Sequence, residues 1–156
     1  MLEKLPYKTT SEHDLINYAR KLNIPYFVGV MMRDELPSYP RLNECGILNL
    51  ENHLQQGSHW ICWYKKGKTR YYFDSFAEPP PLELLNYLKT SVELAQDLPC
   101  IIRNAITVQH DESSECGSLC LFVLKKLTSG IPFPEILTSL ASRYEKRWND
   151  PLEIEL

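Results

Sequence analysis

Cys116 lies between a polar segment, residues 109–115, and an apolar stretch that begins CGSLCLFVL. The apolar residues of this stretch recur at helical spacing, so we predict a helix over residues 116–130 that ends at a glycine. A cysteine at the start of a helix meets free backbone amides and the positive end of the helix dipole, which favour the nucleophilic thiolate. Gly117 would let another backbone or a substrate approach closely. Cys116 is therefore a candidate nucleophile, with a small buried core residue as the alternative.

His59 and Asp74 lie on two aromatic-rich runs, residues 57–64 and 69–76, that are joined by the turn sequence KKGK. Such runs around a short glycine-containing turn are typical of a β-hairpin. Pairing about the middle of that turn would make His59 and Asp74 cross-strand neighbours. A carboxylate among aromatic rings needs a partner, and an imidazole N–H is the one available. The hairpin then supplies a general base and a carboxylate that orients it, although His59 alone would fit an exposed strand end.

Gln109 stands seven positions before Cys116. Its side-chain amide could donate a hydrogen bond to the oxyanion of a tetrahedral intermediate, together with the backbone N–H of Cys116. Each of these four residues has an ordinary structural explanation by itself. Together they form a nucleophile, a base, an orienting acid and an oxyanion donor, which is hard to explain as packing.

The elements that would position these residues follow from periodicity and from proline and glycine. Besides the helix at Cys116, we predict helices over residues 11–22, about 82–95 and 136–148, and strands over 26–32 and 101–109. The apolar stripe of the second of these helices is Leu82, Leu85, Leu88, Val92 and Ala95. Helices at both ends flank strands in the middle without alternating with them. The predicted fold class is therefore α+β with a mainly antiparallel sheet.

Composition excludes several classes of protein. A chain of 156 residues with 44% hydrophobic and 24% charged residues fits one folded domain, residues 1–156, and excludes disordered and fibrous chains. No apolar run approaches the roughly 20 residues that span a bilayer, and residues 1–10 lack the apolar region of a secretory signal, so we expect neither a membrane span nor export. Five cysteines, an odd number, predict free thiols in a reducing intracellular compartment rather than a disulfide framework.

A net charge of -3 argues against a nucleic-acid partner. We expect the local basic clusters to be a solvated turn and a solvated helix face. The turn cluster is Lys65, Lys66, Lys68 and Arg70, and the helix cluster is Arg143, Lys146 and Arg147.

The remaining cysteines and histidines are expected to be structural. Cys45 repeats the Glu-Cys-Gly context of Cys116, but polar residues soon follow it, so a buried structural thiol is expected there. Cys120 lies four residues after Cys116 and, with His110, could suggest a metal site, but a structural zinc needs four ligands and no metal is predicted. Cys62 is expected in the core. The other two histidines, His13 and His53, and His110 are expected at the surface or in loops.

The ordered set GSHW, YFDSF and Q-x6-CGSLC resembles the adenovirus-type cysteine proteases, the adenains, and more distantly the ubiquitin-like-protein proteases of the same clan. The opening SEHDLINYARKLNIPYFVG also resembles the adenain N-terminus, so the resemblance covers nearly the whole chain. It implies that His59 is the general base, Asp74 orients it, Cys116 is the nucleophile and Gln109 completes the oxyanion hole. Adenoviral enzymes have Glu where Asp74 stands, whereas the ubiquitin-like-protein proteases have Asp.

The resemblance implies a cysteine endopeptidase from a virus or a virus-like transposon, with a central sheet packed against the nucleophile helix. Its substrates would be virion precursor proteins, cleaved after a small residue, usually glycine, with Trp60 in the wall of the glycine channel. It would act as a monomer in the host cytoplasm, the nucleus or the virion. Adenoviral enzymes are stimulated by DNA and by a disulfide-linked peptide. The net charge argues against DNA here, and Cys100 resembles the peptide-capturing cysteine, with a structural thiol as the alternative.

Three alternative functions remain open. The first is an isopeptidase that removes a ubiquitin-like modifier, for which 156 residues leave little docking surface. The second is acyl transfer to a protein by the same triad. The third is a binding module that keeps the scaffold without catalysis, although all four catalytic positions hold competent residues.

Overall fold

The computed structural model describes residues 2–6, 10–51, 59–90, 99–111, 113–146 and 151–155. His53, residues 57–58 of the predicted hairpin, residues 91–95 of the predicted second helix and Arg147 lie outside these ranges. The elements in chain order are β1 (Leu2–Lys4), α1 (Glu12–Lys21), β2 (Phe27–Met32), β3 (Glu44–Asn49), β4 (Trp60–Lys66), β5 (Thr69–Phe73), α2 (Leu82–Leu88), β6 (Cys100–Arg103), α3 (Cys116–Thr128), α4 (Phe133–Lys146) and β7 (Glu153–Glu155).

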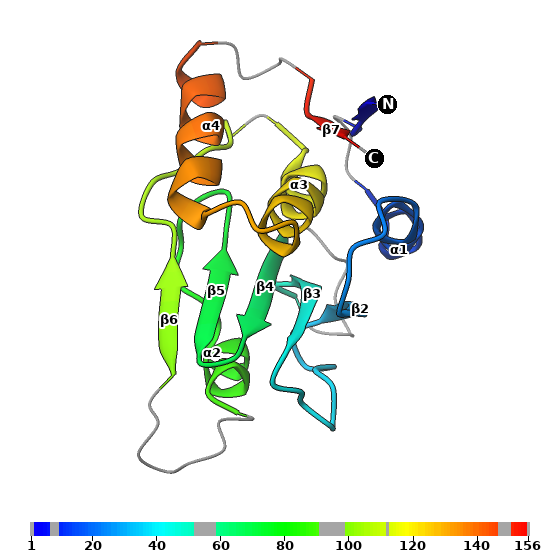
Figure 1. The fold of residues 1–156 in the computed structure, drawn as a ribbon, viewed down its shortest axis with the longest axis vertical. Helices are drawn as coiled ribbons and strands as arrows, with labels where there is room; N and C mark the ends of the chain where they lie inside the picture. The colour runs from blue at the N-terminus through cyan, green and yellow to red at the C-terminus, as the bar shows by residue number, and fades with distance from the viewer. Residues whose placement is uncertain are drawn as a thin grey trace.

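The centre of the molecule is a five-stranded sheet with the order β2-β3-β4-β5-β6. The inner pairs, β3–β4 and β4–β5, are antiparallel, and the outer pairs, β2–β3 and β5–β6, are parallel. Helix α3 packs against one face and α2 against the other (Figure 1). The α+β class and the sheet packed against the helix of Cys116 are therefore confirmed.

Side chains alternate along the strands between two apolar cores, as the period of two in a strand requires. On the α3 face, Ile47 and Phe73 pack with the helix, which is buried almost all round. On the α2 face, Ile61 and Trp63 pack with Leu84 and its neighbours. Burying each large apolar side chain contributes about 1.5–3 kcal/mol, so both helices are fixed mainly by these cores.

The termini of two helices agree with the sequence prediction. Ser11 caps α1, because its Oγ accepts a hydrogen bond from the amide of Asp14 at 3.1 Å and the Asp14 carboxylate accepts one from Ser11 N at 3.5 Å. This is a capping box with Asp in place of Glu. Helix α3 begins at Cys116, and Gly130 follows it at a φ of +91°, a backbone conformation that favours glycine.

Two strands of the central sheet differ from the prediction, and the outlying strands β1 and β7 were not predicted either. The strand predicted over residues 101–109 is the shorter β6, because Asn104 turns its side chain to the backbone of Asp74 and the chain leaves the ladder there. Strand β3 was not predicted. All six of its residues are buried, including Glu44 and Asn49, so it lacks the alternation by which a half-buried strand is recognised.

The apolar stripe predicted for α2 is right at Leu88, which is buried, but wrong at Leu82, and it left out Leu84 and Tyr87. The buried residues are Leu84, Tyr87 and Leu88, whereas Leu82 is 67% exposed. A helix of two turns allows a stripe to be drawn through either face. Tyr87, which lies edge-on to Trp63 with ring centroids 5.9 Å apart, decides which face packs.

The prediction that the basic turn is solvated was also partly wrong, because Lys65 and Arg70 are wholly buried. The turn itself is only Gly67 and Lys68, so both residues lie within the strands and face α2. Lys65 Nζ lies 3.0 Å from a carboxylate oxygen of Glu44, its cross-strand partner. Arg70 donates hydrogen bonds to backbone carbonyl oxygens of Gly67, Leu88 and Thr90.

None of the helices in the described ranges is long and apolar enough to cross a bilayer. In the same part of the chain, no three His, Cys, Asp or Glu side chains come together in a group that could hold a metal ion.

Candidate active site

His59 and Asp74 form a hydrogen-bonded pair at the end of the hairpin. His59 directly precedes β4 and Asp74 directly follows β5. Nε2 of the imidazole lies 2.7 Å from Oδ1 of Asp74, which also accepts a hydrogen bond from the amide of Phe76 at 2.9 Å. The Phe76 ring stacks on the imidazole with centroids 4.9 Å apart. The imidazole is therefore fixed at one edge and one face, and 14% of the His59 side chain is exposed.

The hairpin register differs from the predicted one by two residues. Cys62 pairs with Phe73, so His59 falls opposite Phe76 rather than opposite Asp74. The reason is the two-residue turn, in which Gly67 has a φ of +59°. Asp74 still reaches His59 because the chain leaves β5 after Phe73 and turns back, with Ala77 N bonded to Asp74 O at 2.8 Å.

Cys116 is held beside this pair by the strand that carries the histidine. It is the first residue of α3 and is only 4% exposed. The amide of Trp60, the residue after His59, donates to its Sγ at 3.5 Å. The Cys116 side chain also lies close enough to the imidazole to raise the pKa of His59. The nucleophile, the imidazole and the carboxylate thus form one chain of contacts.

The charge state of His59 follows from these contacts. Burial acts to lower the pKa of His59, but the hydrogen bonds to Asp74 and Cys116 and the charges of both groups raise it to about 9. The imidazole is therefore protonated at neutral pH. An imidazolium beside a cysteine stabilises the thiolate, the form that attacks a carbonyl carbon.

Gln109 is 3% exposed, and its side-chain amide is bound at both ends. Nε2 donates to the carbonyl oxygen of Ser113 at 2.9 Å, and Oε1 accepts from the hydroxyl of Ser75 at 2.5 Å. Because a carbonyl oxygen can only accept, Ser113 fixes which end of the amide is the NH2 group, and Ser75 must then be the donor. The amide carries a second N–H, the donor that an oxyanion would use.

Two residues of this arrangement were missed by the sequence prediction. Asn104 accepts a hydrogen bond from Asp74 N at 3.1 Å and donates to Asp74 O at 2.6 Å. Ser75 connects the segment of Asp74 to Gln109. The available signal was weak: each is a polar residue two positions after the last apolar residue of a strand, and buried polar groups need partners.

Trp60, predicted to form part of the wall of a glycine channel, packs next to Cys116 and is largely buried. Only 5% of it is exposed, and its indole N–H donates to the carbonyl oxygen of Thr10 at 3.1 Å. Gly117 lies against the same residues, and a Cβ atom there would collide with Thr10 Oγ1. The close approach predicted at Gly117 is therefore real, but the approaching atoms belong to the side chains of Thr10, Leu15 and Trp60 of this chain.

No protein-family model and no curated protein sequence matches this chain. Two solved structures of the ASFV pS273R protease match it in three dimensions. The first has a TM-score of 0.56 and 16% identity over 92% of this chain and 67% of that one. The second, a Se-Met form, has a TM-score of 0.51 and 14% identity over 92% and 68%.

The chain shares the fold of a viral protease. At this identity the likeness to the ASFV protease concerns the fold. The chemistry of the present chain must therefore be argued from its own residues.

The other predicted residues lie apart from the site. Cys100 is exposed at the start of β6, with its amide bonded to Lys68 O. Burial raises the pKa of both the Cys45 and Cys120 thiols, which suits structural residues. Cys62 is buried, as predicted. His110 lies in a loop, as predicted, and its ring stacks on that of Tyr144.

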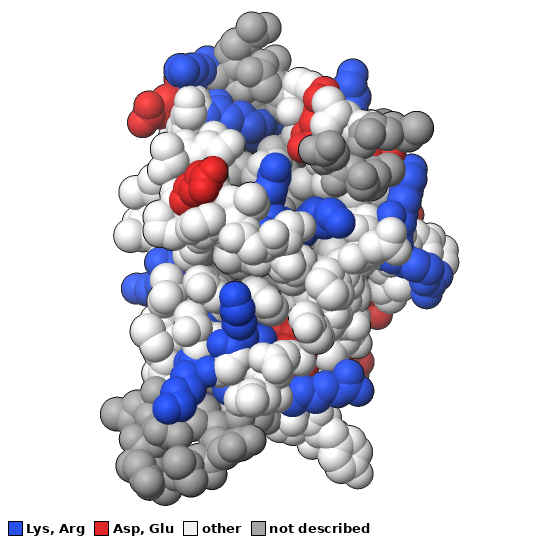
Figure 2. Space-filling model, in the orientation of Figure 1, with Lys and Arg blue, Asp and Glu red and all other residues white. Residues whose placement is uncertain are grey.

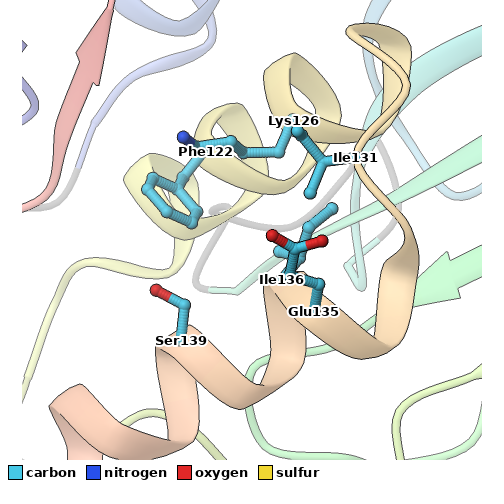
Figure 3. Close-up of a pocket in the computed structure, with 6 residues that line it drawn as sticks. All are labelled: Phe122, Lys126, Ile131, Glu135, Ile136 and Ser139. Atoms are coloured by element: carbon cyan, nitrogen blue, oxygen red, sulfur yellow. The ribbon is translucent and has the colours of Figure 1, made fainter.

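A cavity of about 150 Å³ lies between α3 and α4, away from these residues (Figure 3). Its lining residues are Phe122, Lys126, Ile131, Glu135, Ile136 and Ser139. The first of them is already nearly two turns along α3 from Cys116, and the side chain of Lys126 extends back over the Phe122 ring. This cavity is not the catalytic centre.

Proposed function

We propose that this chain is a cysteine endopeptidase of the adenain type, with Cys116 as nucleophile, His59 as acid and base, Asp74 as the residue that orients His59, and Gln109 as an oxyanion donor. The observation that carries the proposal is the contact chain from Asp74 through His59 to the first residue of α3. The pKa of His59, raised to about 9, supports an imidazolium that is ready to pair with a thiolate.

The first half of the reaction forms an acyl-enzyme. The Cys116 thiolate attacks the carbonyl carbon of the scissile peptide, and the π electrons of the C=O bond move to oxygen. That oxyanion accepts hydrogen bonds from the Cys116 amide and the free N–H of Gln109. The C–N bond then breaks as the His59 imidazolium gives its Nδ1 proton to the departing amine, leaving a thioester and a neutral imidazole.

The second half releases the acid product. Neutral His59 takes a proton from water, whose oxygen attacks the thioester carbon and again places charge on the oxyanion. Collapse of this intermediate breaks the C–S bond, so the thiolate and the imidazolium are both regenerated. Throughout, the carboxylate of Asp74 keeps Nε2 protonated and the ring in one orientation.

The substrate is a protein cleaved after a small residue, with glycine preferred and virion precursors as the natural class. The motif resemblance and the viral source of the structural neighbours support this choice. The enzyme would act as a monomer. Its five free cysteines fit a reducing host compartment or the virion. The net charge of -3 argues against a nucleic-acid cofactor. On the face in Figure 2, Lys and Arg side chains are scattered over much of the surface.

An activating peptide is the cofactor that the sequence allows. Cys100 is exposed, and β6 is the outer strand of the described sheet. A peptide thiol could therefore reach Cys100 and form a disulfide if an oxidant such as a second disulfide accepts the two electrons. Comparing activity with and without a Cys-containing peptide, in the wild type and in Cys100→Ser, tests this. A gain that Cys100→Ser keeps would exclude capture at this thiol.

Cleavage of a peptide set that differs only in the residue before the scissile bond, Gly, Ala or Phe, tests the main proposal. We expect turnover with Gly, less with Ala, none with Phe, and none at all in Cys116→Ala. Activity confined to a diglycine-ended modifier fusion would replace the endopeptidase by an isopeptidase, and a requirement for acetyl-CoA would replace it by acyl transfer. A folded protein that is inert in all three assays would be a binding module.

A further inference from the structure

Glu115 stands directly before the nucleophile and is the N-cap residue of α3, with 1% exposure. Polar side chains at this position usually accept hydrogen bonds from the free amides of the first turn. In this helix the first backbone hydrogen bond runs from Leu119 N to Glu115 O at 2.9 Å, so the amides of Cys116, Gly117 and Ser118 precede it. Those are the amides nearest the reacting carbonyl, yet the Glu115 side chain makes no capping bond to them.

Arg143 of α4 accounts for this. Its Nη1 lies 2.9 Å from Oε1 of Glu115 and its Nη2 lies 2.8 Å from Oε2, so both carboxylate oxygens are taken in a two-pronged ion pair. The two side chains are only 10% and 2% exposed. The pair is too dry for solvent to screen it, and it keeps the carboxylate directed to α4 rather than to α3.

Helix α4 also holds the other end of the same loop. The ring of His110, the residue after Gln109, stacks on Tyr144 with centroids 4.1 Å apart, and its Nε2 lies 3.1 Å from Tyr144 O. Further from the site, α3 and α4 leave the cavity of Figure 3 between them. The last turns of α4 therefore contact the segment between Gln109 and Cys116 at both ends.

We propose that Arg143 is a positioning residue of the active site: it holds the Glu115 carboxylate away from the first-turn amides of α3, so that these amides serve the Cys116 thiolate and the oxyanion. This inference rests on the proposed function. A carboxylate released from Arg143 would accept hydrogen bonds from those amides and would stand beside a thiolate of the same charge. Both effects slow attack by Cys116.

The test is the rate of Cys116 alkylation by iodoacetamide near neutral pH, read by peptide mass spectrometry, with exposed Cys100 as the internal reference. Arg143→Met should slow Cys116 about tenfold or more, since an unpaired carboxylate then faces the thiolate. The double variant Glu115→Gln/Arg143→Met should recover to within about threefold of the wild type, because the negative charge is gone. Glu115→Gln alone should not slow the reaction.

Lys146→Met is the matched control, because it removes one exposed positive charge from the same helix and leaves Glu115 paired. It should react like the wild type. In the peptide assay, Arg143→Met should lower kcat more than it raises KM, since the amides act on the transition state.

Three results would overturn the inference: Arg143→Met at the wild-type rate, a double variant as slow as Arg143→Met, or slowing by Glu115→Gln alone. If Arg143→Met does not fold, the alkylation rates of Glu115→Gln and of the double variant decide instead. They support the inference only if Cys116 reacts in both variants as it does in the wild type. Cys116 of the wild type reacting no faster than Cys100 would remove the proposed function, and this inference with it. Slowing confined to Arg143→Met leaves the proposed function standing.

Discussion

Two clusters of buried charge lie on opposite faces of one sheet. The catalytic cluster, on the α3 face, consists of His59, Asp74, Ser75, Gln109 and Cys116. The Lys65 cluster, on the α2 face, consists of Glu44, Lys65, Arg70, Tyr87 and Thr90. Both contain ionisable groups bound to each other in the interior, and both sit on the same hairpin, β4–β5.

The difference lies in what each cluster leaves accessible. Lys65 and Glu44 are fully buried, and the Lys65 ammonium lies 3.9 Å from the centre of the Tyr87 ring and bonds Thr90. The catalytic cluster instead contains a thiol at a helix N-terminus and a partly exposed imidazole. Buried charge by itself therefore does not mark a catalytic site, whereas a paired and partly exposed imidazole next to a thiol at a helix N-terminus does.

Removing the nucleophile is the strongest test that the catalytic cluster, unlike the Lys65 cluster, carries the activity. Cys116→Ala should lower turnover by about 10⁴-fold or more, because no acyl-enzyme can form, while the melting temperature changes little. Glycine-peptide cleavage and thermal denaturation measure the two quantities. Cys45→Ala, which removes a buried thiol of the same core, should stay within about threefold of wild-type turnover per folded molecule. The reverse result would make Cys45 the nucleophile.

Asp74→Asn should have the next largest effect, a fall in kcat/KM of about 10²–10⁴-fold, because a neutral amide no longer fixes the protonated imidazole. It should also change the pH profile. In the wild type the pKa of His59 is raised to about 9, so the proton for the leaving amine is available up to that pH and lost above it. In Asp74→Asn the alkaline limb of the pH–rate profile should move to lower pH, toward the ordinary histidine pKa of about 6.5.

The same shift has a consequence for stability. A pKa raised by folding stabilises the folded chain fully below the unfolded value of about 6.5, and this contribution disappears as the pH rises through the folded value. Denaturant titrations between these limits should show a loss of stability with rising pH in the wild type. A variant without the carboxylate should show a smaller loss, and an equal loss would mean that Asp74 is not the cause.

Lys65→Met should lower the stability of the fold and leave turnover per folded molecule nearly unchanged, the opposite of Cys116→Ala. It leaves the buried Glu44 carboxylate without its ammonium partner, so the free energy of unfolding should fall by about 3–5 kcal/mol. Turnover per folded molecule should stay near the wild-type value, because no member of the Lys65 cluster contacts His59 or Cys116 in the described part of the chain. Glu44→Gln/Lys65→Met should restore much of the stability. A loss of turnover per folded molecule would show that the two clusters are coupled.

Ser75→Ala should have the smallest effect of the series, about tenfold in kcat with little change in KM, because Gln109 loses the hydroxyl that holds its oxygen end. The double-mutant cycle with Gln109→Ala distinguishes positioning from general damage. If Ser75 acts through Gln109, adding Ser75→Ala to Gln109→Ala should cost nothing further. A full additional tenfold loss would point to an independent role.

Local signals in the sequence sufficed for much of this molecule. The capping box at Ser11, the apolar period after Cys116 and the aromatic hairpin each reside in a few consecutive residues, and the predicted elements agree. The residues that could not be predicted depend on partners far away in the chain. Lys65 is buried only because Glu44 and Tyr87 meet it, and Asn104 belongs to the site only because β6 ends beside Asp74.

The hairpin shows that a residue pair can be predicted correctly from an incorrect strand register. His59 and Asp74 were expected to meet as cross-strand neighbours, but they meet through the turn after β5. The two-residue turn was not distinguishable from a pairing centred one residue earlier, because Lys-Lys-Gly-Lys permits both. Residue type indicated the partnership, while backbone geometry determined how it forms.

The pairing of β1 with β7 has a consequence for the order in which the active site is completed during synthesis. β1 pairs with β7, and Leu5 N bonds Leu152 O, while the carbonyl oxygen of Pro6 accepts a hydrogen bond from Ser118 in the first turn of α3 (Figure 1). A chain still growing on a ribosome therefore carries His59 and Cys116 long before it carries the strand that holds this N-terminal segment against α3. Strand β7, which is made after both catalytic residues, completes the support under the first turn of the nucleophile helix.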